Sequence, residues 1–198
     1  MSDTFLVVGL GNPGPGYAFN RHNVGHMVVD VLAERIGAGW KTHKAGAVVA
    51  EGRLGVGASA AKLILAKSTG YMNTSGRPVA GLMKFYGVDL AHTIVLHDEL
   101  DIPPADVRIK VGGGHAGHNG LRDIIAANGG ADAGSGFVRV RIGIGRPPGQ
   151  MQTADYVLAN FGTAEKKELP VTLEIAADAV ESIVREGVTA AQQRLHGK

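Results

Sequence analysis

The strongest constraint on the fold is an apolar run that ends abruptly in a loop of glycine and proline. Residues 5–10 read FLVVGL, which has the length and β-branched content of a buried strand. The next residues, GNPGPG at 11–16, exclude regular structure, so the strand delivers Asn12 to a loop at its carboxyl end. In open α/β sheets this edge holds ligands, because strand ends and helix starts leave a crevice there. The sequence therefore predicts a functional site around Asn12.

The same stretch matches the dinucleotide-binding pattern G-x-G-x-x-G through Gly9, Gly11 and Gly14. That fingerprint requires the last glycine to open a helix whose N-terminus holds the pyrophosphate. Here Pro15 keeps the chain in a loop, and the next helical pattern starts only near Val24. No acidic residue ends a second strand at the distance needed to bind a ribose. A dinucleotide site is therefore the weaker alternative.

The rest of the chain alternates strand and helix patterns, which is typical of an α/β protein. Apolar residues at three- and four-residue spacing predict helices, and alternating or continuous apolar runs predict strands. Helices are expected at 24–36, 76–86 and 164–186, with shorter ones after 120, after 153 and near the C-terminus. Strands are expected at 46–54, 62–66, 93–97, 106–111 and 137–144. We expect a single domain over residues 1–198, with a twisted mixed, largely parallel sheet flanked by helices.

Small polar residues and glycines mark the ends of these predicted helices. Asn23, Ser75 and Asn119 are placed to act as N-caps, because their short side chains can accept a hydrogen bond from the first helical turn. Gly37 and Gly87 follow the last periodic residues and are expected to end two of the helices.

Composition narrows the chemistry that this chain can perform. No cysteine occurs among the 198 residues, which excludes disulfides, thiolate nucleophiles and cysteine-bound metals. The formal net charge of +2 is compatible with an anionic partner, but it is far below the strongly positive net charge of a charge-driven nucleic-acid binder. No run approaches the ~18 apolar residues of a membrane span, and the start MSDTFLVV lacks a targeting pattern. We expect a cytoplasmic protein without a membrane partner.

Five polar residues in loops that follow predicted strands could meet in one crevice: Asn12, His22, Asn73, Asp98 and Asn119. No serine lies in a G-x-S-x-G elbow, so a water remains as the attacking group. His22 is then the natural general base, and Asp98 would hold its far ring nitrogen and stabilise the imidazolium. The asparagine amides suit the recognition of a peptide group or of an oxyanion. The alternative is a surface histidine beside an unrelated acidic turn.

A metal hydrolase is a second enzyme hypothesis. His115 and His118 are three residues apart and could bind a metal together with Asp98 or Asp101. The glycines before these histidines make a poor rigid platform, and no helix carries an acidic–histidine metal motif. The metal hypothesis is the less favoured one, and we expect no metal.

Specific motifs are spread over nearly the whole chain. They are GLGNPG with Tyr17 and Arg21-His22-Asn23, Met72-Asn73 before Ser75-Gly76, HDELD at 97–101, GGGHAGHNGL from 112, RVRIGIG from 139 and Tyr156-Val157-Leu158. With these motifs the chain resembles the bacterial peptidyl-tRNA hydrolases. Only the last helices are generic.

The resemblance implies hydrolysis of the ester that joins a peptide to the 3′-terminal ribose of tRNA, which releases free tRNA for reuse. It implies that His22 acts as the base, that Asp98 orients it, and that Asn12 separates blocked from free aminoacyl esters. It also implies that the enzyme needs no metal or cofactor, and the expected state is a monomer.

By the same resemblance, further positions contact the substrate or its tRNA phosphates. The substrate positions are Tyr17, Tyr71, Asn73 and Asn119, and the phosphate positions are Lys110 and Arg141. Position 71 is tyrosine where relatives often have phenylalanine, which keeps the aromatic face. The alternative from another class is a non-catalytic RNA-binding or RNA-processing protein on the same fold.

Overall fold

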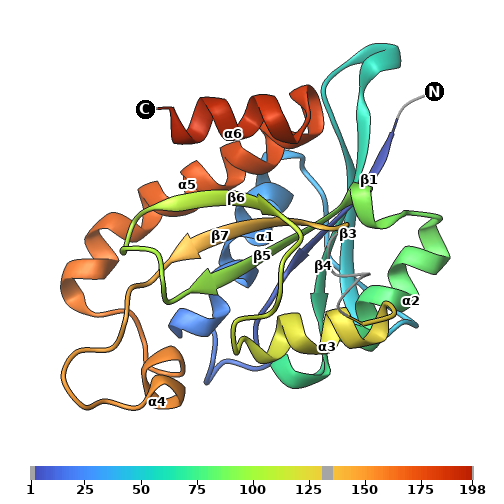
Figure 1. Cartoon of the computed structure of the whole chain (residues 1–198). Coiled ribbons are helices and arrows are strands. Elements are labelled where there is room, and N and C mark those ends of the chain that lie inside the picture. The colour runs from blue at the N-terminus through green and yellow to red at the C-terminus, as the bar shows by residue number, and fades with distance from the viewer. Residues whose placement is uncertain (1–2, 131–135, 198) are drawn as a thin grey trace.

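A computed structural model describes residues 3–130 and 136–197 and contains one seven-stranded sheet (Figure 1). The sheet has the order β2-β3-β4-β1-β5-β7-β6. Its strands are β1 (Thr4–Gly9), β2 (Lys41–His43), β3 (Ala47–Leu54), β4 (Ala61–Ser68), β5 (Thr93–Glu99), β6 (Val107–Val111) and β7 (Val138–Gly143). The four central strands β4, β1, β5 and β7 pair in parallel, and the pairs β2–β3, β3–β4 and β6–β7 are antiparallel. The predicted mixed, largely parallel sheet is confirmed.

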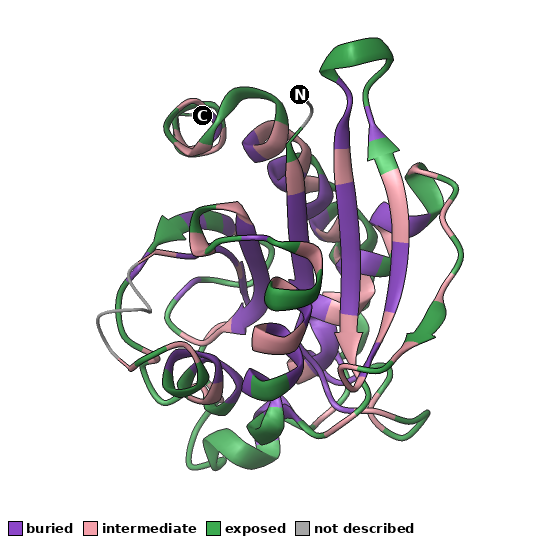
Figure 2. Ribbon diagram, turned by 90° about the vertical axis from the view of Figure 1, so that its right-hand side faces the viewer, coloured by how far each residue is buried: buried purple, intermediate pink, exposed green. Residues whose placement is uncertain are grey.

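Helices cover both faces of this sheet. They are α1 (Val24–Arg35), α2 (Gly76–Tyr86), α3 (Asn119–Ala127), α4 (Thr153–Val157), α5 (Thr163–Glu186) and α6 (Val188–His196). One hydrophobic core lies between the sheet and α1, α5 and α6, and a second lies between the sheet and α2 and α3. Figure 2 shows that the buried residues concentrate in the central strands, whereas the tip of the β3–β4 hairpin projects as an exposed loop. None of the helices in these described ranges is both long and apolar enough to cross a bilayer.

Three strands differ from the prediction, and one of them is β4, which continues to Ser68, two residues beyond its expected end. β2 was not predicted, because its sequence KTH is short, polar and largely exposed, and it forms only by pairing with β3 at the edge of the sheet. β5 extends two residues beyond the expected end, so Asp98 lies within the strand and not in the loop after it.

The strand order places the carboxyl ends of β1 and β5 side by side. β1 lies between β4 and β5. The chain after β1 passes to β2 at the edge of the sheet and returns through β3 to β4. The connection after β4 then crosses to β5, on the other side of β1. Such a reversal opens a crevice outside the strand ends. Asn12 follows β1 and Asp98 is the second-last residue of β5, so both residues lie at this crevice.

Glycines in β1, in the first loop and in α1 allow this helix to lie directly against the sheet. A Cβ on Gly9 would lie 2.2 Å from the carbonyl oxygen of Gly25 in α1, and a Cβ on Gly25 would lie 2.3 Å from the carbonyl oxygen of Leu96 in β5. A Cβ on Gly11 would lie 2.7 Å from the ring of His26. Close packing therefore explains two of the glycines in the G-x-G-x-x-G pattern, and no helix begins directly after the third, since the next one is η1 at Arg21.

The predicted helix ends are right, but the predicted N-caps are not. Gly87 ends α2 in the left-handed conformation with φ 66°, as expected. The side chains of Asn23 and Ser75 make no cap hydrogen bond. Asn119 is the first residue of α3, and the residue before it, His118, is the N-cap through its ring nitrogen.

Candidate active site

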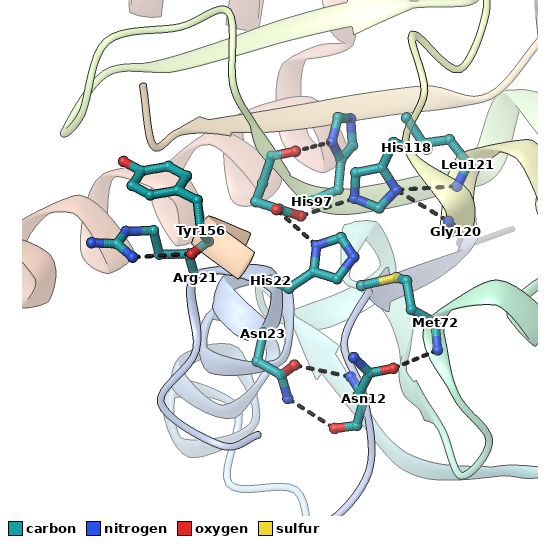
Figure 3. Close-up of polar contacts among 11 residues, drawn as sticks. Asn12, Arg21, His22, Asn23, Met72, His97, His118, Gly120, Leu121 and Tyr156 are labelled. Carbon is teal, nitrogen blue, oxygen red and sulfur yellow. Dashed lines mark hydrogen bonds and ion pairs between the residues drawn. The ribbon is translucent and has the colours of Figure 1, made fainter. Parts of the chain in front are cut away.

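His22 and Asp98 come together although 76 residues separate them in sequence. His22 lies on the short 3-10 turn η1 (Arg21–Asn23), directly before α1, and its Nδ1 is 2.8 Å from Oδ2 of Asp98 at the end of β5 (Figure 3). The side chain of Asp98 is 2% exposed and that of His22 is 11% exposed. The contact that the sequence analysis expected is therefore present in the structure.

The charge of Asp98 is stabilised by two imidazoles. Burial raises the pKa of Asp98, but His22 and His118 lower it more, so the pKa lies well below its usual range. Oδ1 of Asp98 is 2.8 Å from Nε2 of His118. His97 also contacts this residue, with its Nδ1 2.8 Å from the Asp98 carbonyl oxygen. Burial and the neighbouring His118 lower the pKa of His97 to about 3, so this ring stays neutral near pH 7.

Asn12 is held so that only one end of its side-chain amide is free. Its Oδ1 accepts a hydrogen bond of 2.7 Å from the backbone N–H of Met72. The side chain of Asn23 pairs with the backbone of Asn12 through two 2.9 Å hydrogen bonds. Because a backbone N–H can only donate, the atom that faces Met72 must be the oxygen. The Nδ2 group of Asn12 therefore points away from Met72, toward the side of His22 in Figure 3.

Two adjoining hollows share His22 and Asn119. The first has a volume of about 450 Å³ and is lined by Asn12, His22, Tyr71, Met72, Asn73, Asn119, Ala154, Val157 and Leu158. The second has a volume of about 410 Å³, and its polar lining includes His22, Asp98, Glu99, His115, His118, Asn119 and Arg146. All five residues that were expected in one crevice therefore line one or both of these hollows.

The predicted aromatic positions lie beside the first hollow, whereas the predicted basic positions do not. The rings of Tyr17 and Tyr71 meet edge to face with centroids 6.2 Å apart, and Tyr71 is 58% exposed. Lys110 on β6 and Arg141 on β7 line neither hollow. They lie on the edge of the sheet, where β6 pairs with β7.

Several residues around the site have structural roles that the sequence analysis did not identify. Arg21 binds Glu165 in α5 and the carbonyl oxygen of Tyr156, and it stacks on the Tyr156 ring at 4.0 Å, so it ties η1 to two helices. The buried guanidinium of Arg139 donates to the carbonyl oxygens of Gly113 and Gly114 and thus holds the loop before α3. No local sequence signal marks these roles, because every partner is distant in sequence.

The residues of the metal hypothesis do not form one group. Nδ1 of His115 accepts the N–H of Gly117, and Asp101 pairs with Arg146. Within the described ranges, the only three possible ligand atoms that lie within 4.8 Å of one another belong to His22, Asp98 and His118. Asp98 already contacts each of the two histidines at 2.8 Å, the length of a hydrogen bond with a proton between the two atoms. A metal ion would have to displace both protons.

The fold and site together define an α/β protein with a carboxylate-bound imidazole and free amide groups at the carboxyl edge of its sheet. The chain matches the peptidyl-tRNA hydrolase family over residues 6–198. The peptidyl-tRNA hydrolases of Pseudarthrobacter chlorophenolicus and Arthrobacter sp. are 59% and 57% identical to it over 196 residues, covering 99% of this chain and 97% and 98% of the relatives.

A solved structure agrees with these relatives. The crystal structure of peptidyl-tRNA hydrolase from Acinetobacter baumannii has a TM-score of 0.84 to this chain at 37% identity, covering 98% of this chain and 95% of that chain. The chain belongs to the peptidyl-tRNA hydrolase family.

Proposed function

We propose that this protein hydrolyses the ester between the peptide and the 3′-terminal ribose of peptidyl-tRNA, and thereby releases tRNA for reuse. The observation that carries the proposal is the 2.8 Å contact between His22 Nδ1 and Asp98 Oδ2 beside the two hollows. A carboxylate at Nδ1 keeps the proton on that nitrogen and leaves the lone pair of Nε2 free for a water. Membership of the peptidyl-tRNA hydrolase family supports the class of substrate.

In the proposed reaction a water is the nucleophile. Nε2 of His22 takes a proton from the water as its oxygen attacks the ester carbonyl, which gives a tetrahedral intermediate with an oxyanion. Asp98 stabilises the imidazolium that forms. The amides of Asn73 and Asn119, which line the first hollow beside His22, are the available donors for the oxyanion. The intermediate then expels the ribose 3′ oxygen, which takes the proton from the imidazolium.

Asn12 provides a physical basis for selecting blocked substrates. Its amide oxygen is occupied by the N–H of Met72, so it offers only N–H donors to the first hollow. The carbonyl of an N-blocked substrate can accept such a hydrogen bond, whereas the ammonium of a free aminoacyl ester is itself only a donor. A donor facing a donor leaves both groups unpaired and desolvated, which gives strong discrimination.

The first prediction concerns His22. His22→Ala is expected to lower kcat for N-acetylated aminoacyl-tRNA about 10²- to 10⁴-fold, which is the range of a positioned general base. The measurement is release of the acylated amino acid by wild type and variant, with free aminoacyl-tRNA as the second substrate and excess EDTA in a parallel series. Wild type should cleave the blocked ester much faster than the free one, with or without EDTA. An inactive wild type or a fully active variant would contradict the proposal, and loss of activity in EDTA would restore the metal hypothesis.

Basic side chains on one face of β6 and β7 are the proposed contact for the tRNA phosphates. Arg108 pairs with Arg141 across these strands, and Lys110 pairs with Arg139, so four cations occupy neighbouring cross-strand positions. Arg139 is buried and donates to loop carbonyls, so the other three remain for phosphates. Like charges placed opposite each other destabilise a sheet unless an anion compensates them. Among the ion pairs of residues 3–130 and 136–197, Arg108 has a carboxylate partner, whereas Lys110 and Arg141 have none.

The second prediction tests this phosphate contact. Lys110→Ala and Arg141→Ala are each expected to raise KM for peptidyl-tRNA and to leave kcat nearly unchanged, because phosphate contacts bind the substrate without taking part in the chemistry. Each should also reduce the slope of log KM against log salt by about 0.9 or less. Lys41→Ala, on the opposite edge strand β2 and paired with Glu51, is the matched control. Unchanged KM and salt dependence in both variants would contradict the contact.

The alternative, a non-catalytic RNA-binding protein, is not favoured. A protein that only binds RNA has no need of an oriented base, yet a buried carboxylate holds the His22 ring in this structure.

A further inference from the structure

Asp98 is bound by two histidines, one on each carboxylate oxygen. Oδ2 contacts His22 and Oδ1 contacts His118, both at 2.8 Å, and the two imidazole rings lie 4.9 Å apart. The proposed mechanism uses only the first of these contacts. The second histidine is 10% exposed in its side chain, so its hydrogen bond is largely shielded from water.

The backbone of α3 determines which nitrogen of His118 carries the proton. Nδ1 of His118 accepts the backbone N–H groups of Gly120 at 3.2 Å and Leu121 at 3.4 Å (Figure 3). A backbone N–H can only donate, so Nδ1 must be unprotonated. In the neutral ring the hydrogen is then on Nε2, which donates it to Asp98. The helix start therefore sets the tautomer of His118.

This arrangement also fixes the orientation of the Asp98 carboxylate. Its Oδ1 always faces a donor from His118, and the carboxylate plane is fixed so that Oδ2 faces Nδ1 of His22. The other titratable and charged groups near the pair are His97, whose ring is 5.1 Å from that of His118, and Arg139, which acts on His97. Neither contacts the two carboxylate oxygens through a hydrogen bond of the described residues.

We propose that His118 is a positioning residue for the hydrolysis: it links the N-terminus of α3 to Asp98 and thereby holds that carboxylate in the orientation that makes His22 a base. This inference rests on the proposed role of His22. It gives the N-cap of α3 a second role besides capping the start of the helix, because one ring accepts from the helix backbone and donates to the catalytic carboxylate.

Two substitutions separate these tasks. In His118→Asn the amide oxygen takes about the place of Nδ1 and can still cap α3, but the side chain is too short to reach Asp98. In His118→Gln the amide nitrogen takes about the place of Nε2 and can still donate to Asp98, but the acceptor for the helix is lost. The pair thus removes one hydrogen-bond function at a time from the same position.

The experiment measures kcat, KM and Tm for wild type, both variants and His22→Ala with N-acetylated aminoacyl-tRNA. We expect His118→Asn to lower kcat about 10- to 100-fold, the usual effect of losing a partner that orients a reacting group, with little change in KM. Its Tm should fall as well, because one oxygen of the buried Asp98 carboxylate loses its donor. His118→Gln should recover most of that kcat although its own Tm is lowered by the loss of the helix cap. Nitrogen-15 NMR of the histidine rings should show His22 protonated on Nδ1 in wild type and His118→Gln, and a mixture of tautomers in His118→Asn.

Three outcomes would overturn the inference. One is wild-type kcat in His118→Asn. Another is a loss of kcat that follows Tm in both variants, which would make the residue a helix cap only. If either is found while His22→Ala is inactive, the proposed function stands and only the inference fails. Wild-type activity in His22→Ala is the third outcome, and it would remove the proposed function and the inference together.

Discussion

Asp98→Asn is expected to reduce kcat for peptidyl-tRNA about 10⁴-fold, although it only replaces one carboxylate oxygen by an NH₂ group. His118 faces Oδ1 as a donor, so the asparagine oxygen must turn to His118. The asparagine NH₂ group then faces Nδ1 of His22 and forces that nitrogen to accept. The proton of His22 moves to Nε2, and the lone pair that should take a proton from water is lost.

We expect this loss to match the upper end of the range given for His22→Ala, because both variants lack a lone pair at the position of Nε2 that could take a proton from water. Asp101→Asn is the matched control, since Asp101 is 59% exposed in its side chain and pairs with the exposed Arg146. Far-ultraviolet circular dichroism and Tm should show that both variants are folded. A kcat for Asp98→Asn within tenfold of wild type would contradict the role of this carboxylate.

Gly25→Ala is expected to lower the free energy of unfolding by about 3 kcal/mol or more, a large share of the roughly 5–15 kcal/mol of a typical domain. A Cβ at this position would lie 2.3 Å from the Leu96 carbonyl oxygen and 2.6 Å from the Leu10 backbone nitrogen. Both contacts are with backbone of the central sheet, which cannot move without separating α1 from β1 and β5. Because η1 leads directly into α1, the position of His22 should change as well.

Urea unfolding followed by circular dichroism measures this effect. Gly16→Ala, in the loop between β1 and η1, is the control, because a Cβ there meets no atom within 4 Å. Its free energy of unfolding should stay unchanged or rise by at most about 1 kcal/mol, since alanine restricts the unfolded chain. Equal urea midpoints for the two variants would show that the approach of α1 to the sheet is not as close as the structure indicates.

Local patterns in the sequence predicted most of the fold. The run at residues 5–10 is buried on both faces of the sheet, so its apolar character was visible without any tertiary information. Gly87 was recognisable as a helix end because the left-handed conformation favours glycine. β2 was not predictable, since its three polar residues are a strand only through pairing with β3.

The candidate site was predictable to the extent that it follows from strand ends. Asn12 and Asp98 lie at the carboxyl ends of β1 and β5, and parallel strands bring such ends to one edge of the sheet. The contact of Asp98 with His22 followed from this placement and from the family resemblance. Lys110 and Arg141 lie outside both hollows. Their phosphate contacts stay predictions, because no contact within the protein tests them.

The sequence by itself determined the order of most strands and helices along the chain and the polar residues at the strand ends, because these depend on the character of neighbouring residues. Only the tertiary structure decided how the side chains are directed. Asn119 looked like the cap of α3, yet His118 takes that place, and Asn12 turns its oxygen to Met72. A hydrogen bond depends on the position of both partners, and the partners here come from strands and helices that are distant in sequence.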